Sequence, residues 1–196
     1  MKLVTTALPG VVIVEAAVFG DDRGWFMESF NEARWLEALQ TLGLPASRRF
    51  VQDNHSCSQA GVLRGLHYQL PPHPQGKLVR VVKGAAYDVA VDIRRGSPTF
   101  GQWEGVELNE QNRRQLWVPE GFAHGFMALT DDTHFLYKTT DIYARDCERS
   151  IRWDDPALAI TWPKVNGSPR LAPKDAAAPL MAEVGLPPWQ GDAGQK

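Results

Sequence analysis

The stretch VLRGLHYQ, residues 62–69, places a cation and an acid–base group inside an apolar run with the composition of a β-strand. Arg64 can hold an anionic group through its planar guanidinium, and His67 can take or give a proton near neutral pH. Strict alternation puts these two side chains on opposite faces of a strand. Both can serve one site only if the strand carries a bulge or twist near Gly65, which a glycine permits.

Other strand-like runs also carry polar side chains that suit proton transfer. In HFLYKTT, residues 134–140, Tyr137 shares a face with Phe135, as a side chain that points into a core would. Histidine, tyrosine, lysine and carboxylates together suit proton transfer next to a carbonyl. For Asp88 and Asp92, which alternate onto one face, we expect structural hydrogen bonds. The remaining polar candidates in these runs are Lys77, Arg80, His134 and Lys138.

A metal site is a second kind of chemistry to test. PEGFAH, residues 119–124, has the Pro-x-Gly-x-x-His pattern of the second motif of cupin metalloproteins. The first cupin motif needs His-x-His followed by Glu, whereas LHYQLPPHPQGK, residues 66–77, keeps one histidine of that pair and lacks the Glu. Three strong protein ligands are usual for a catalytic divalent metal. We therefore expect no metal and no cofactor, and the sequence has no nucleophile elbow or nucleotide-binding glycine motif.

The elements that position these groups follow from periodicity. Between Val62 and Tyr143, short runs of Val, Leu, Phe, Tyr and Trp alternate with turn signals, which is typical of an antiparallel sandwich or barrel. Helical spacing marks residues 31–45, with Asn31 as the cap and Gly43 near the end. A second helix is predicted in residues 174–188, with Asp175 at its start.

We predict a mainly β fold, a cupin-like double-stranded β-helix (jelly roll) barrel with a few short helices near the termini, in a single domain over residues 1–196. The 21 Lys and Arg against 23 Asp and Glu give no positive field for nucleic acid or an anionic membrane. The apolar runs at the N-terminus are too short to span a bilayer, so we expect a cytoplasmic protein. With 2 cysteines, Cys57 and Cys147, a disulfide framework is not expected.

Nine segments, in order along the chain, resemble the dTDP-4-dehydrorhamnose 3,5-epimerase family. They are VFGDDRGWFMES, FVQDNHS, VLRGLHYQ, QGKLVR, DVAVDIR, SPTFGQW, RQLWVPEGFAHGF, FLYKTTDIY and KDAAAP. The resemblance runs from Val18 to Pro179. It implies a metal-free isomerase that is a homodimer and acts on a dTDP-4-keto-6-deoxy sugar. Such an enzyme inverts C3 and C5 to give dTDP-4-keto-L-rhamnose for dTDP-rhamnose biosynthesis.

The resemblance also implies roles for individual residues. His67 is the base, Asp175 its carboxylate partner, Tyr137 the proton donor and Lys77 the cation near the C4 oxygen. From the local sequence alone, Asp175 fits a helix N-cap as well. The substrate-binding positions that correspond to the family are Arg23, Glu28, Gln52, Asp53, Asn54, Arg64, Lys77, His124, Glu148 and Lys174. Arg23 and Glu28 lie near the N-terminus, from where a segment of such dimers can reach the neighbouring subunit.

Three other functions stay open at this point. A 3-epimerase or keto-sugar isomerase on the same fold would share the base and place the acid differently. A sugar-binding jelly roll would not need His67, Asp175, Lys77 and Tyr137 together. A metal-dependent cupin would need ligands that the first motif lacks.

Overall fold

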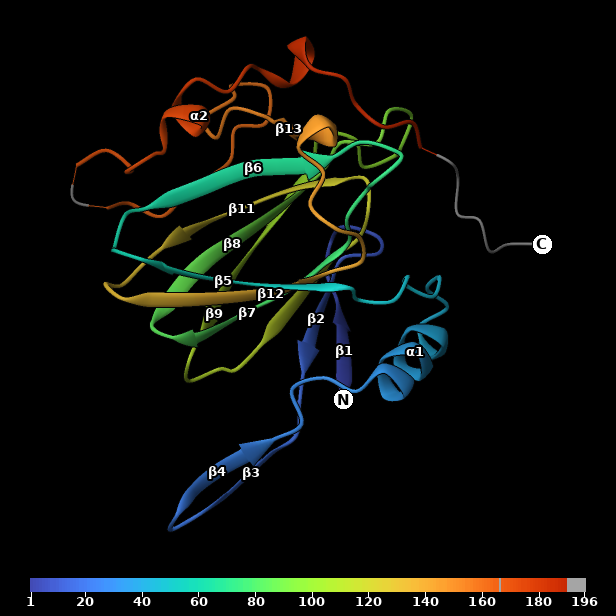
Figure 1. Cartoon of the computed structure of the whole chain (residues 1–196), viewed down its shortest axis with the longest axis vertical. Coiled ribbons are helices and arrows are strands. Elements are labelled where there is room, and N and C mark those ends of the chain that lie inside the picture. Colours follow the sequence, from blue (N-terminus) through green and yellow to red (C-terminus); the bar gives the residue numbers. More distant parts are fainter. Residues whose placement is uncertain (166, 190–196) are drawn as a thin grey trace.

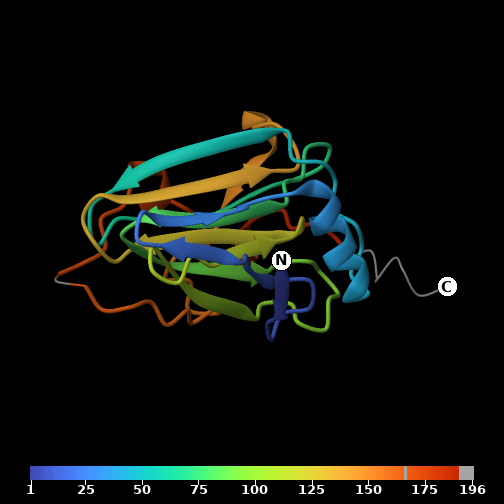
Figure 2. The ribbon, with the colours of Figure 1, turned by 90° about the horizontal axis from the view of Figure 1, so that it is seen from below.

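Two antiparallel sheets face each other in the computed structural model, which describes residues 1–165 and 167–189. Their strand orders are β1-β2-β10-β7-β12-β5 and β13-β6-β11-β8-β9 (Figure 1). Figure 2, seen from below, shows the strands of the body lying side by side with α1 at one end. The jelly-roll prediction is confirmed. Within the described ranges no hydrogen-bonded strand pair joins the two sheets, so they are not closed into the barrel that the sequence predicted.

The strands of the first sheet are β1 (Lys2–Thr5), β2 (Val12–Glu15), β10 (Gln115–Val118), β7 (Lys77–Lys83), β12 (Thr133–Thr139) and β5 (Gln52–Ser58). Those of the second are β13 (Glu148–Ser150), β6 (Leu63–Gln69), β11 (Phe122–Ala128), β8 (Ala85–Asp92) and β9 (Trp103–Asn109). The remaining elements are the hairpin β3 (Val18–Asp21) and β4 (Gly24–Met27), the helices α1 (Glu32–Thr41) and α2 (Pro173–Ala176), and two 3-10 turns at Arg145–Cys147 and Met181–Glu183.

The core between the sheets is aromatic at its centre. Phe126 of β11 stacks on Phe135 of β12 with ring centroids 3.9 Å apart, and both are buried. β11 is buried along its whole length, because its other face is also covered. Strands buried on both faces lose the alternation of polar and apolar residues. Charged side chains nevertheless occupy other interior positions, and these form the candidate site.

The helix that the sequence predicted over residues 31–45 is confirmed as α1, which covers the outer face of the first sheet. Asn31 caps its start by accepting a hydrogen bond from the Arg34 backbone N–H at 3.2 Å. Trp35 and Leu39 are buried against outward-facing residues of β2, β7 and β10. Gly43, with a φ of +67°, takes the left-handed conformation that ends the helix.

The second predicted helix, over residues 174–188, is wrong. The segment forms only α2 (Pro173–Ala176) and a 3-10 turn (Met181–Glu183). Pro179 cannot lie inside a helix, since it has no N–H to donate, and its carbonyl instead accepts from the Arg152 backbone. The cap position of α2 is Ala172, so Asp175 is not an N-cap. No helix of the described residues is long and apolar enough to cross a membrane.

Strand β6 bends at Gly65, as expected from its sequence. The register pairs His67 with His124 and Arg64 with Phe126, and it shifts between these two pairs. Gly65 has a φ of +134°, which side chains rarely adopt. After this irregularity both side chains serve the side of β6 that faces the opposite sheet, where Arg64 donates to Ser58 of β5 at 3.1 Å, although strict alternation would separate them.

Gly65 is also a point of close contact between β6 and β11. A Cβ atom at Gly65 would lie 2.6 Å from the Cα of Gly125. We therefore predict that Gly65→Ala lowers the free energy of unfolding by roughly 3 kcal/mol, from backbone strain plus the clash. Gly96→Ala is the matched control, because its φ is +91° and nothing lies within 4 Å of its added Cβ. Denaturant unfolding measures both variants, and equal losses would contradict the role of the contact.

Candidate active site

The candidate site lies in the gap between the sheets. β6 contributes Arg64 and His67, and β11 contributes His124 next to His67 in register. From the opposite sheet, β7 contributes Lys77 and β12 contributes Tyr137, which packs beside the aromatic core. Five side chains predicted from four sequence segments are thus brought to one region between the sheets.

His67 and Asp175 form a close pair. The Nε2 atom of His67 lies 2.6 Å from Oδ1 of Asp175, and the two residues are 108 positions apart in the chain. The Asp175 side chain is 2% exposed and that of His67 is 23% exposed. A carboxylate only accepts hydrogen bonds, so an ionised Asp175 places the ring proton on Nε2 and leaves Nδ1 with a lone pair. The geometry is that of a histidine base held by a buried acid.

Lys77 is a buried cation next to this pair. Its Nζ donates to the backbone carbonyl of His67 at 3.3 Å, and the residue is 8% exposed. Burial lowers the pKa of Lys77 to about 8; the charges of Asp88 and Glu148 oppose this shift and that of Lys174 adds to it. The ammonium group keeps donors free for an anionic oxygen.

Tyr137 has the properties of a proton donor. Burial raises the pKa of its hydroxyl, and the nearby Glu148 charge raises it further, against the opposite effects of Arg64 and Lys174. The phenol therefore keeps its proton at neutral pH. The predicted shared face with Phe135 is confirmed, because the two rings lie 6.3 Å apart inside the molecule.

A polar cluster from β13 and α2 adjoins the pair. Glu148 accepts hydrogen bonds from Lys174 and from the Tyr143 hydroxyl, each at 3.0 Å. Burial opposes ionisation of Glu148, but the contacts from Lys174 and Tyr143 outweigh it and lower the pKa of this carboxyl. The charge of His67 also reaches Glu148, so the cluster adjoins the histidine.

Of the three substrate-binding residues predicted on β5, two point toward the site and one points away from it. Gln52 and Asn54 alternate onto the inner face and are hydrogen-bonded to each other at 2.9 Å. Asp53 lies on the outer face, where Lys138 donates to it at 2.9 Å. The side chain of Asp53 therefore does not join the site within this subunit, because successive residues of a strand point to opposite faces.

Arg23 and Glu28 are also outside the cluster. Arg23 lies in the turn of the β3–β4 hairpin and is hydrogen-bonded to Asp21. Glu28 pairs with Arg34 of α1 at 2.9 Å. Figure 1 shows the hairpin projecting from the end of the body that lies away from β6 and α2.

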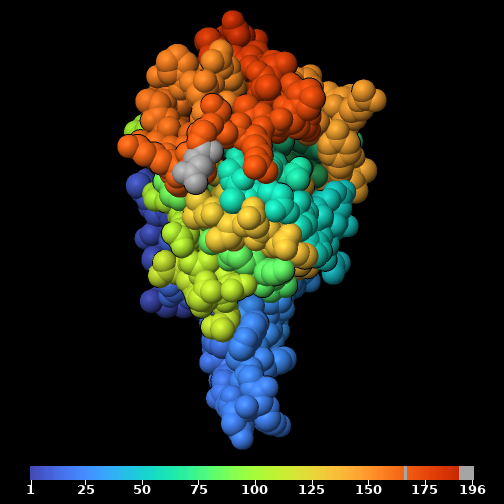
Figure 3. Space-filling view, turned by 90° about the vertical axis from the view of Figure 1, so that its left-hand side faces the viewer, coloured from blue at the N-terminus to red at the C-terminus, as the bar shows by residue number. Residues whose placement is uncertain are grey.

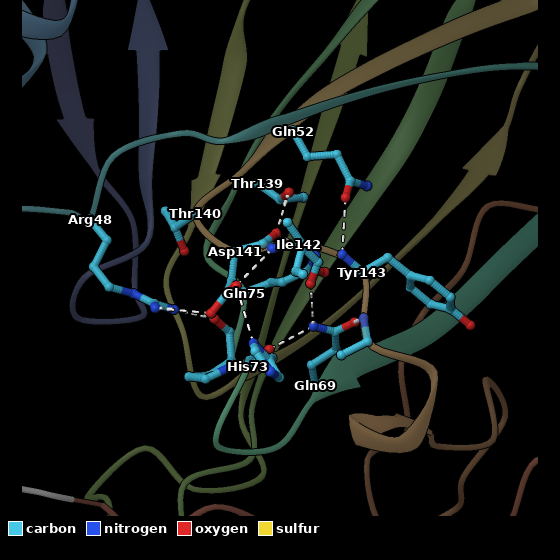
Figure 4. Close-up of polar contacts among 12 residues, drawn as sticks. Arg48, Gln52, Gln69, His73, Gln75, Thr139, Thr140, Asp141, Ile142 and Tyr143 are labelled. Carbon is cyan, nitrogen blue, oxygen red and sulfur yellow. Dashed lines mark hydrogen bonds and ion pairs between the residues drawn. The ribbon is translucent and has the colours of Figure 1, made fainter.

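The loop after β12 is held by a buried glutamine (Figure 4). The Nε2 atom of Gln69 donates to the carbonyls of His73 at 2.6 Å and Ile142 at 3.1 Å. Its Oε1 accepts from the Ala144 backbone N–H at 2.8 Å. Gln69 thus joins the loop after β6, which holds the LPPHP segment, to the loop after β12.

Further side chains fix the same loop (Figure 4). Asp141 accepts from Arg48 at 3.1 Å and from His73 at 3.3 Å. Gln52 accepts from the Tyr143 backbone N–H at 3.0 Å. The loop therefore presents Tyr143 to Glu148 in one defined position, although its backbone belongs to no sheet.

Three residues of this region were not selected as functional from the sequence: Asp88, which was expected to be structural, together with Gln69 and Tyr143. Tyr143 is the last residue of FLYKTTDIY and Gln69 the last of VLRGLHYQ, so the signal in the sequence is that both belong to segments that resemble the family. Among the described residues, no three His, Cys, Asp or Glu side chains form a group able to hold a metal ion.

Comparisons with known proteins find similarity to one family over most of the chain. The family model described as dTDP-4-dehydrorhamnose 3,5-epimerase matches residues 5–183. The dTDP-4-dehydrorhamnose 3,5-epimerase of Shigella flexneri is 55% identical over 175 residues, which cover 89% of this chain and 93% of that protein.

Solved structures are similar over nearly the whole chain. The dTDP-6-deoxy-D-glucose-3,5-epimerase of Legionella pneumophila, in complex with dTDP-4-keto-L-rhamnose, has a TM-score of 0.89 and 50% identity, covering 96% of this chain and 98% of that one. A 3′-monoepimerase of Streptomyces bikiniensis, in complex with dTDP-quinovose, has a TM-score of 0.81 and 34% identity, covering 93% of this chain and 88% of that one.

The glutamine contacts predict a local effect on the loop after β12. Gln69→Met keeps the side-chain length but removes three hydrogen bonds, which leaves backbone groups of both loops without partners. We expect amide hydrogen exchange in residues 142–144 to become roughly 10-fold faster or more, because local opening costs less free energy. Gln59→Met, at an exposed glutamine bonded to Asp132, is the control and leaves these amides unchanged. Exchange in Gln69→Met equal to that of the control would contradict the holding role.

Proposed function

The chain belongs to the dTDP-4-dehydrorhamnose 3,5-epimerase family, and from this premise we propose that it converts dTDP-4-keto-6-deoxy-D-glucose to dTDP-4-keto-L-rhamnose. The observation that carries the residue assignment is the 2.6 Å pair of His67 and the buried Asp175 beside Lys77. The enzyme is an isomerase of dTDP-sugars and works by acid–base chemistry of its own side chains.

The reaction follows from the acidity next to a ketone. The C4 carbonyl acidifies the hydrogens on C3 and C5, so a base can remove either one and leave an enolate. His67 takes the proton on Nδ1, and Asp175 stabilises the imidazolium that forms through Nε2. Lys77 stabilises the negative charge that develops on the C4 oxygen.

Inversion requires an acid on the other face of the sugar ring. Tyr137 donates this proton to the enolate carbon, and its raised pKa keeps the proton available at neutral pH. The cycle returns one proton to the sugar for each one removed, and exchange with solvent resets His67 and Tyr137. Inversion at C3 and inversion at C5 use the same four side chains.

The diphosphate requires cations at the entrance of the site. Arg64, His124 and Lys174 lie on β6, β11 and α2 around His67. The guanidinium of Arg64 can give two hydrogen bonds to one phosphate, while its Nε donates to Ser58 at 3.1 Å. Gln52, Asn54 and Glu148 are assigned to other parts of the nucleotide sugar.

Double inversion is favoured over inversion at C3 alone. The chain is 55% identical to the 3,5-epimerase of Shigella flexneri and 34% identical to the 3′-monoepimerase of Streptomyces bikiniensis. Both kinds of enzyme occur on this fold, so the difference depends on how the acid is placed. The partly buried Tyr137 beside Phe135 is the position that we assign to this acid.

A homodimer is supported by the hairpin. Figure 3 shows it as a narrow stalk outside the body, and its large apolar side chains are exposed, with Phe19 at 66% and Phe26 at 69%. Exposed aromatic surface of this kind is typical of an interface. A second copy that covers the hairpin would receive Arg23 and Glu28 at its own site, which neither residue reaches within its own subunit.

The function is tested by proton NMR with dTDP-4-keto-6-deoxy-D-glucose in deuterated water. We expect deuterium at both C3 and C5 and the signals of the L-rhamno product. His67→Ala slows exchange at both carbons by roughly 100-fold or more. Tyr137→Phe still exchanges a ring proton but does not complete the inversion, because the base is retained and the acid is lost.

His134→Ala is the control for this experiment, since His134 pairs with His55 on the outer face of β12 and leaves the rate unchanged. Deuterium at C3 alone would point to a 3-epimerase. No deuterium at either carbon, or undiminished turnover in His67→Ala, would overturn the proposed reaction.

If Arg23 acts at the site of the neighbouring subunit, two defective variants should restore activity when they form a mixed dimer. We expect Arg23→Ala and His67→Ala to be weakly active alone, whereas an equal mixture, unfolded and refolded together, recovers about a quarter of wild-type activity. Half of the random dimers are then mixed, and each holds one site with both side chains intact. Mixtures no more active than the separate variants would show that Arg23 does not act across the dimer.

A further inference from the structure

Strand β8 holds two buried aspartates on the same face, and their partners differ. Asp92 accepts from Arg94, Ser97 and Thr99, all from the turn directly after the strand. It fixes that turn and is a structural carboxylate, as the sequence predicted. Asp88 instead bonds to a side chain of a different strand, and both its oxygens lie inside the site.

The partner of Asp88 is His124. The Nε2 atom of His124 lies 2.8 Å and 3.0 Å from the two carboxylate oxygens. Asp88 is fully buried and His124 is 7% exposed. Because an ionised carboxylate only accepts, Nε2 carries a proton and Nδ1 is the ring nitrogen left for a ligand. His124 is the register partner of His67 across β6 and β11, so Asp88 orients the ring beside the base.

Lys77 enters the same region from the opposite sheet, because its Nζ donates to the backbone carbonyl of His67, the residue in register with His124. Among the charged groups around this lysine, Asp88 of β8 and Glu148 of β13 favour its protonated form, whereas Lys174 of α2 and burial oppose it. Glu148 is already paired with Lys174 at 3.0 Å. Among the described ion pairs, Asp88 is paired with His124 and with no lysine or arginine, so no such cation cancels its effect on the nearby Lys77.

We propose that Asp88 is a positioning residue of the reaction, which orients His124 beside His67 and keeps Lys77 protonated so that it can stabilise the enolate oxygen. This inference rests on the proposed function of Lys77. Asp88 acts only through these two side chains and does not touch the sugar. A buried lysine without a nearby carboxylate loses its proton near neutral pH, and a neutral amine stabilises an enolate far less.

The test compares Asp88→Asn with Asp92→Asn, two isosteric changes of fully buried aspartates on the same strand. Lys77 is active as the cation, so activity falls as pH rises through its pKa of about 8. Without the Asp88 charge this pKa falls, and the alkaline limb of kcat moves down by roughly one pH unit.

The ratio of Asp88→Asn to wild-type activity therefore falls as pH rises from 6.5 to 8.5. For Asp92→Asn, the ratio is the same at each pH even if stability drops. A constant ratio for Asp88→Asn would overturn the proposal.

A second readout needs no activity. Carbon NMR of labelled lysines follows the titration of Lys77, whose signal is assigned by its loss in Lys77→Arg. We expect a midpoint about one unit lower in Asp88→Asn than in the wild type, and no change in Asp92→Asn. If the protein does not epimerise the keto sugar, the proposed function fails, while this titration still decides the link between Asp88 and Lys77. An unchanged midpoint in a folded Asp88→Asn would overturn that link.

Asp88→Glu separates charge from shape and covers the case in which Asp88→Asn does not fold. It keeps the negative charge, so the Lys77 midpoint stays within a few tenths of a unit of the wild type. Its longer side chain displaces His124, so the KM for the dTDP sugar rises. A midpoint in Asp88→Glu as low as the one expected for Asp88→Asn would show that the carboxylate charge is not the cause.

Discussion

Burial of charge between two sheets is the constraint on which this structure depends. A jelly roll normally fills the gap with apolar side chains, and here Phe126 and Phe135 do so in one part. The site puts His67, Lys77 and His124 into the same gap, where an uncompensated charge is costly. Each of these side chains therefore lies near a carboxylate: Asp175 is bonded to His67, Asp88 is bonded to His124, and the charge of Asp88 favours the protonated form of Lys77.

The segment after β13, which lies outside the two sheets, positions Asp175 against His67. After β13 the chain crosses the outer face of the five-stranded sheet (Figure 1), where Arg152 binds the Pro179 carbonyl and Tyr68 binds that of Gly185 at 2.7 Å. These contacts hold α2 so that Asp175 reaches His67. A continuous helix over this segment would satisfy its own backbone, whereas the broken form lets its carbonyls bond to the sheet below. The break at Pro179 thus helps to fix the position of α2 and, with it, of Asp175.

One fold supports both double and single epimerases, so the catalytic outcome depends on small differences within a common site. The base and its carboxylate can form an enolate at either carbon next to the ketone. In the proposed mechanism, inversion depends on the acid on the opposite ring face and on the charge of the lysine near the C4 oxygen. In this chain, the properties that the proposed mechanism depends on are the position and raised pKa of Tyr137 and the protonation of Lys77.

The sequence by itself determined the strand runs, the cap and end of α1, the inward face of Tyr137 and the need for a bend at Gly65, because all of these follow from local periodicity and backbone sterics. Alternation also separates Asp53 from Gln52 and Asn54, although the family resemblance grouped the three. The resemblance supplied the roles of His67, Asp175 and Lys77, which local patterns left open between function and structure.

Only the tertiary structure showed that Asp175 lies against His67 and not at a helix cap, that Asp88 faces His124, and that Gln69 holds the loop of Tyr143. These are contacts between distant segments, and their geometry depends on how the two sheets pack, which no local pattern contains.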